Sequence, residues 1–109
     1  MIINDNSIML NKIRWDIKFV SENNDVLDGN RGVCCYRTST IYILESLKPS
    51  EKLFTLFHEL AHALLAETDY NIEIKENLGN NYEKFVSLLG ARIYELCEQI
   101  ELSQCVNQR

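Results

Sequence analysis

The chain has 109 residues, 46% of them hydrophobic and 25% charged, an ordinary globular composition that argues against a disordered or fibrous protein. Its length predicts one domain over residues 1–109 with a single hydrophobic core. The net charge of −5, without a lysine- or arginine-rich cluster, argues against a nucleic-acid partner, and no apolar run approaches the roughly 20 residues that span a bilayer.

The first residues lack the features of a secretion signal. Residues 1–7 contain no basic region followed by a long apolar stretch, so we expect the protein in the cytoplasm. In that reducing compartment the four cysteines are expected to be unpaired structural thiols: Cys34, Cys35, Cys97 and Cys105. The adjacent pair would point to opposite faces of a strand, which argues against one shared metal ion.

The first half of the chain predicts strands. Residues 1–11 are polar and are expected to form a loose lead-in. Apolar and polar side chains alternate over residues 13–19, which is typical of a strand with one buried face. Residues 21–32 predict a loop, and two short β-prone segments, residues 32–36 and 40–44, are close enough for a hairpin. We therefore expect a small antiparallel sheet of about three strands.

A buried helix follows the strands. Pro49, Ser50 and Glu51 are helix-start signals: proline in the first turn, serine as a possible cap and an acid near the N-terminus. Apolar residues from Leu53 to Leu65 then cover a wide arc of a 3.6-residue period. This pattern predicts a largely buried helix that ends near residues 67–69.

The end of the chain predicts a second, longer helix. Residues 71–81 are polar, include Gly79 and are interpreted as a connection. From Tyr82 to about Leu102 the apolar residues again follow a helical period. Residues 103–109 are expected to be loose.

An HExxH motif, His58-Glu59-Leu60-Ala61-His62, lies within the predicted buried helix. Residues four apart share one helix face, so both imidazoles can reach one zinc ion. Glu59 projects to the flank of that face, where it can take a proton from a zinc-bound water as general base. The alternative interpretation is that these are two ordinary surface histidines. It is disfavoured because burying two histidines and a glutamate in an otherwise apolar helix costs free energy unless they have partners.

A catalytic zinc site with two histidines needs a third protein ligand, and no other histidine exists in the chain. The downstream acidic candidates are Glu67, Asp69, Glu73, Glu76 and Glu83. We favour Glu83, in the first turn of the second helix at the border of its apolar face, with Glu76 as the alternative. Glu83 also has a structural interpretation, because Asn80 and Glu83 have the spacing of a capping box.

Two further features could serve catalysis. Tyr36 and Tyr42 are candidate hydrogen-bond donors to a tetrahedral intermediate, although tyrosines of this kind more often pack in the core. Either residues 32–36 or residues 40–44 could bind substrate as an added strand.

The segment from Leu53 to Leu65, LFTLFHELAHALL, resembles the metal-binding helix of the ImmA/IrrE-type metallopeptidases, above all the small stand-alone versions common in phages and prophages. Residues 41–43 resemble the strand before that helix. Residues 83–96 resemble the second helix of these proteins, whose early glutamate is the expected third ligand. The resemblance spans roughly residues 12–102, and the motif helix is its most specific part.

This resemblance implies a minimal, gluzincin-like α+β fold, with a small sheet packed on the HExxH helix and a second long C-terminal helix. It implies a zinc-dependent endopeptidase that cleaves a cytoplasmic protein or peptide, with His58, His62 and Glu83 as zinc ligands and Glu59 as the base. Larger relatives cleave repressor-type regulators and carry a Glu-Ala-Asn-like run where Asn81-Tyr82-Glu83 stands here. The alternative ligand Glu76 therefore stays open.

A function of another class is a non-catalytic, metal-stabilised protein-binding module of phage or prophage origin. Glu59 favours the enzyme, because a purely structural metal site needs no base. A helical packing protein with a chance motif would bind no metal tightly. The sequence does not indicate the oligomeric state.

Overall fold

The structure is a computed structural model that describes residues 6–107, with side chains described up to residue 101. Its elements follow one another in the order β1 (Asn6–Leu10), β2 (Ile13–Val20), η1 (Asp25–Leu27), β3 (Gly32–Cys35), β4 (Thr40–Leu44), α1 (Pro49–Ala66), α2 (Asn71–Leu78), η2 (Gly79–Asn81) and α3 (Tyr82–Asn107). Strands and helices are segregated along the chain, so the predicted α+β class is confirmed. The looseness expected of residues 1–5 and 108–109 lies outside the described residues.

The sheet has four strands and is mixed, so the prediction of about three antiparallel strands is wrong in number and direction. The strand order is β1-β2-β4-β3; β2 and β4 run parallel, and the two outer pairs are antiparallel. β4 takes a central position because it is the most apolar strand, with Ile41 and Ile43 fully buried, whereas every residue of β3 is only half-buried. To place β4 beside β2, the chain crosses over through η1 and β3, which makes that pair parallel.

The unexpected strand, β1, occupies residues 6–10 of the predicted lead-in. Asn11 and Lys12 form a two-residue loop with positive φ angles of 51° and 66°, and Leu10 pairs with Ile13. Two such residues are typical of the tight turn that suits the twist of a hairpin. Ile8 and Leu10 pack against the core from this strand. The loop asparagine and the alternation of these two residues were the signals in the sequence.

The predicted bounds of the first helix agree closely with α1. Pro49 is its first residue, and the Glu51 side chain accepts a hydrogen bond from the Lys48 backbone N–H at 3.3 Å. Ser50 therefore lies inside the first turn and does not cap the helix. The last residue is Ala66, one residue before the predicted end.

The second half of the helical region departs from the prediction at two places. The predicted connection contains a helix of its own, α2, because residues 71–78 include neither glycine nor proline. Gly79–Asn81 then forms a 3-10 turn that leads directly into α3. The last helix continues to Asn107, beyond the predicted end at Leu102.

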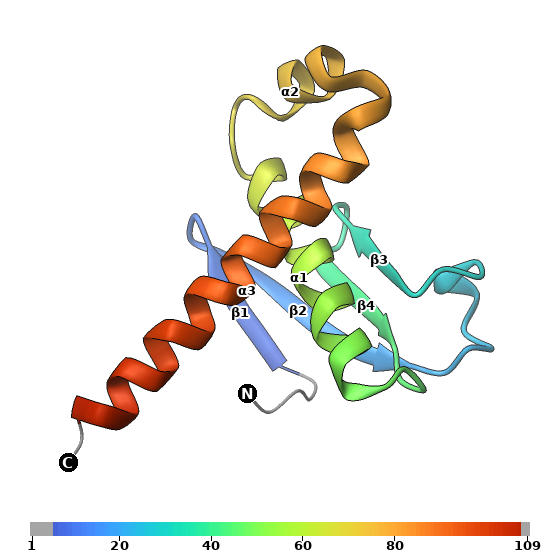
Figure 1. Cartoon of the computed structure of the whole chain (residues 1–109). Coiled ribbons are helices and arrows are strands. Elements are labelled where there is room, and N and C mark those ends of the chain that lie inside the picture. Colours follow the sequence, from blue (N-terminus) through green and yellow to red (C-terminus); the bar gives the residue numbers. More distant parts are fainter. Residues whose placement is uncertain (1–5, 108–109) are drawn as a thin grey trace.

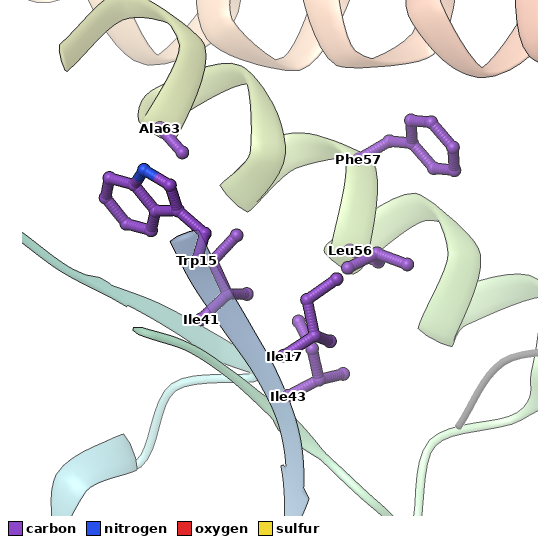
Figure 2. Close-up of a cluster of buried hydrophobic side chains, with 7 residues drawn as sticks. All are labelled: Trp15, Ile17, Ile41, Ile43, Leu56, Phe57 and Ala63. Carbon is purple, nitrogen blue, oxygen red and sulfur yellow. The ribbon is translucent and has the colours of Figure 1, made fainter. Parts of the chain in front are cut away.

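The α1 helix lies between the sheet and α3 (Figure 1). Figure 2 shows Trp15, Ile17, Ile41 and Ile43 directed from β2 and β4 toward α1, which contributes Leu56, Phe57 and Ala63 to the same cluster. Burying these side chains anchors α1 to the sheet. A second cluster joins α1 to α3 and is formed by Ala61, Leu65, Tyr82 and Val86.

The two long helices are in backbone contact at Gly90. A Cβ atom at this position would lie 2.6 Å from the Phe57 carbonyl oxygen and 3.0 Å from the His58 backbone nitrogen. Only glycine permits this approach. Gly90 therefore sets the distance between α3 and the part of α1 that carries the HExxH motif.

Among the helices within residues 6–107, none has the length and apolar character needed to cross a membrane.

Candidate metal centre

The rings of His58 and His62 lie on one side of α1, and Glu83 of α3 contacts both. His58 Nε2 lies 3.1 Å from Glu83 Oε2, and His62 Nε2 lies 3.4 Å from Glu83 Oε1. The histidines are one helical turn apart, and their ring centroids are separated by 5.0 Å. The structure thus brings together the three residues that the sequence singles out, with potential ligand atoms within 4.8 Å of one another.

The spacing of these atoms suits a small tetrahedral cation. Zinc binds imidazole nitrogen and carboxylate oxygen at about 2.0–2.2 Å, so two of its ligands lie about 3.3 Å apart. Each histidine nitrogen lies near this distance from one Glu83 oxygen, His58 Nε2 at 3.1 Å from Oε2 and His62 Nε2 at 3.4 Å from Oε1. Two imidazoles with one carboxylate are also a donor set of hydrolytic zinc sites. The residues present therefore fit a zinc ion.

Ser87 of α3 orients the first histidine. Its hydroxyl oxygen lies 2.9 Å from His58 Nδ1. When the Nδ1–H donates to this oxygen, the ring holds the tautomer whose Nε2 lone pair faces Glu83 and can bind a metal. This role was not predicted. The available signal was the position of Ser87 one turn after a candidate ligand on the same helix.

His62 is more enclosed than His58, with 12% of its side chain exposed against 18%. Burial lowers the pKa of His62, and the neighbouring Glu83 carboxylate opposes this effect only in part. The ring therefore favours the neutral form, which is the form that ligates metals. Within the described residues its Nδ1 atom is buried and has no hydrogen-bond partner.

Glu59 projects from α1 into the same pocket and is only 8% exposed. Burial, with a further contribution from the Glu83 charge, raises the pKa of Glu59 to about 7. Its carboxylate does not belong to the group of ligand atoms formed by the histidines and Glu83. Glu59 is therefore placed beside the candidate metal position and is available for proton transfer.

The pocket around these residues has a volume of about 480 Å³. One wall is the start of β3 and the loop before it, and the others are α1 and α3. Gly32 lets β3 approach α1 closely, because a Cβ atom there would lie 2.7 Å from Thr55 Cγ2 and 3.1 Å from Glu59 Cγ. The edge of the sheet thus passes directly beside the general-base candidate.

The other acidic candidates lie elsewhere. Glu67 accepts a hydrogen bond from the Trp15 indole at 3.2 Å. Asp69, Glu73 and Glu76 are exposed, the last two on α2. In the described part of the chain, only Glu83 joins the two histidines in a group that could hold a metal ion.

The two tyrosine candidates take different positions. Tyr42 alternates with Ile41 and Ile43 on β4, so its side chain lies on the sheet face opposite α1 and away from the pocket. Tyr36 follows β3 and packs edge-on against Trp15. Burial raises the pKa of Tyr36, and the nearby Glu59 and Glu83 charges contribute to this shift.

Cys34, Cys35 and Cys97 form no disulfide. Cys34 packs against the core, where burial, followed by the Glu59 charge, raises its pKa to about 12. The thiol is therefore protonated near pH 7 and is a poor metal ligand. The prediction that Cys105 is unpaired concerns a side chain outside the described residues.

A sequence profile of the Peptidase_M78 family, the IrrE N-terminal-like domain, matches residues 15–86. The matched segment runs from β2 into α3 and is more than half of the chain. It contains both histidines of the motif, the intervening Glu59 and also Glu83. Searches of curated proteins and of solved structures found no match. The chain therefore belongs to the IrrE N-terminal-like family of peptidases.

Proposed function

We propose that the chain is a zinc-dependent endopeptidase that hydrolyses peptide bonds in a cytoplasmic protein. The observation that carries this proposal is the convergence of His58, His62 and Glu83 on a pocket that also contains the buried Glu59. An open metal site beside a carboxylate is the arrangement required for metal-assisted hydrolysis. Membership of a peptidase family supports the same reaction.

The side chains divide the chemistry between them. His58, His62 and Glu83 hold the zinc, and Ser87 orients the His58 ring. When bound, zinc supplies the Lewis acidity that makes water nucleophilic near neutral pH. The Glu59 carboxylate accepts a proton from the attacking water and then delivers it to the departing amine nitrogen.

The substrate backbone is proposed to bind along β3. The sequence left two candidate strands, but β4 lies inside the sheet between β2 and β3 and has no free edge. β3 is an edge strand, and Gly32 at its start lines the pocket. A peptide added to this edge would be held by main-chain hydrogen bonds next to Glu59.

The proposed partner is a protein or peptide, with neither nucleic acid nor membrane involved. The net charge of −5 opposes binding to a polyanion. The unpaired Cys34, Cys35 and Cys97 suit the reducing environment of the cytoplasm. Phage or prophage origin stays part of the proposal, based on the resemblance of the motif helix.

Zinc content is the first test of the site. Elemental mass spectrometry of tag-free protein, purified without chelator, should find about one zinc per wild-type chain. Glu83→Gln should lower this content, while Glu76→Gln, the same change at an exposed carboxylate of α2, should not. A wild-type chain that stays metal-free when zinc is supplied would refute the proposed function.

Turnover separates the enzyme from a metal-stabilised binding module. Zinc-loaded wild type should cleave members of a denatured-protein or peptide mixture, and Glu59→Gln should retain zinc but lose cleavage by at least about 100-fold. Equal zinc content in the two proteins, with no cleavage by either of them, would favour the binding module.

A further inference from the structure

A second cavity lies next to the metal pocket, in the crevice between α1 and α3. Its volume is about 220 Å³. Six uncharged residues line it: Ser50, Leu53, Phe54, Phe57, Ala91 and Tyr94. The candidate mechanism does not use this space.

The two cavities lie on successive turns of the same two helices and share one lining residue. Phe54 lines both of them and stands one helical turn before His58. The same order holds on α3, where Glu83 and Ser87 line the metal pocket and Ala91, one turn further on, lines the second cavity. A molecule bound at the metal pocket can therefore extend a side chain past Phe54 into the second cavity.

Three of the six residues that line the second cavity are aromatic. The rings of Phe57 and Tyr94 meet edge to face, with centroids 5.2 Å apart and planes at 71°. Phe54 lines both cavities and is 56% exposed, although it belongs to a largely buried helix. An exposed aromatic ring at the rim of a concave site gains burial when an apolar group binds.

The size and polarity of the cavity select its occupant. An apolar cavity of roughly 150 Å³ accommodates a benzene ring, so a volume of about 220 Å³ accepts a phenyl ring or a long aliphatic side chain. A charged side chain would find no oppositely charged partner among the lining residues and would lose part of its hydration.

We propose that this cavity receives a large apolar side chain of the peptide substrate, beside the bond that is cleaved. The assignment rests on the proposed peptidase function, because the substrate backbone is what connects the two cavities. Ala91 lies on the α3 wall, and the size of its side chain determines how much space remains for the substrate. The chain is thus selective for aromatic or long aliphatic residues at one side of the scissile bond.

Zinc-binding hydroxamic acids test the cavity without requiring turnover. Acetohydroxamic acid is compared with hydroxamic acids that carry a phenyl ring on linkers of increasing length, by calorimetry on the zinc-loaded protein. Because the phenyl ring becomes buried, the compound with the best linker should bind about 10- to 100-fold more tightly than acetohydroxamic acid. Ala91→Leu should abolish this gain and Ala91→Val should reduce it, while both leave the affinity for acetohydroxamic acid unchanged.

The matched control is Leu88→Ala, which changes an exposed residue of the same helix and should keep the full gain. The assignment is overturned if the phenyl ring raises the affinity of Ala91→Leu as much as that of the wild type. It is also overturned if the ring does not raise the affinity of the wild type. A dimer that dissociates on Ala91→Leu in sedimentation velocity also overturns it, because a second copy would then fill the cavity.

Cleavage of a random peptide library adds the corresponding specificity test. Wild type should cut beside large apolar residues, and Ala91→Leu should shift the preference toward small ones. Hydroxamate binding that follows the expected pattern without any peptide cleavage counts against the proposed function and leaves the assigned cavity standing. Cleavage without an apolar preference counts against the cavity alone.

Discussion

Replacing Glu59 by glutamine should stabilise the metal-free protein at alkaline pH. Burial and the Glu83 charge raise the pKa of Glu59 from 4.5 to about 7. The folded state therefore binds this proton more tightly than the unfolded state, and stability is lost as the pH rises from about 4.5 through about 7. The loss on ionisation is about 3 kcal/mol at most, and water in the open pocket reduces it to about 1–2 kcal/mol.

Thermal unfolding of chelator-treated protein measures this difference. For a domain of this size, about 1–2 kcal/mol corresponds to about 5–10 °C in Tm. Glu59→Gln should therefore melt above wild type at about pH 8, and the two should melt together at about pH 4, where the wild-type carboxyl is protonated.

The control for this experiment is Glu76→Gln, the same chemical change at an exposed position of α2, which should leave Tm unchanged at both pH values. Equal melting temperatures of Glu59→Gln and wild type at the higher pH would refute the reasoning. An increase in Tm of the same size at both pH values would also refute it, since such an increase would reflect packing and not ionisation.

Ser87→Ala removes the hydroxyl that holds His58 Nδ1 and should weaken zinc binding about 10- to 100-fold; unchanged affinity in competition with a chromophoric chelator would show that the hydroxyl does not orient the ring. Gly90→Ala places a Cβ atom 2.6 Å from the backbone of α1 and should lower the free energy of unfolding, measured in urea, by about 2 kcal/mol. A variant more stable than the wild type would contradict the close helix contact. Zinc at a thousandfold excess over its Kd should add about 4 kcal/mol to stability, and a Tm unaffected by zinc would mean that His58, His62 and Glu83 do not bind it.

The local parts of the site could be predicted from the sequence because they depend on a single helix. The bounds of α1 followed from Pro49 and the apolar period, and the shared face of His58 and His62 follows from their spacing alone. The proximity of Glu83 is not local. The sequence ranked it above Glu76, and the structure places Glu83 at the histidines because the Gly90 contact brings α3 against α1.

The parts that could not be predicted depend on contacts between distant segments. The central place of β4 results from competition among strands for burial, which no single strand reveals. β1 is short, begins with the polar Asn6 and Ser7, and forms because its hairpin partner β2 provides a paired edge. The hydroxyl of Ser87 becomes a partner of His58, 29 residues earlier in the chain, only when α1 and α3 pack together.

The α2 helix is attached to the molecule by a few partly buried side chains, with Ile74 and Leu78 packed against the apolar cluster between α1 and α3. It contributes no buried residue, and the Tyr82 hydroxyl donates a hydrogen bond to Asn71 Oδ1 at 3.0 Å where the helix begins. The neighbouring helices are held together independently, by their apolar cluster and by the contact of His58 with Glu83. Lengthening a connection costs only about 0.6 kcal/mol for each doubling of its length. This segment is therefore where the chain can accept inserted residues, such as an added recognition element, without repacking the core or displacing the ligands.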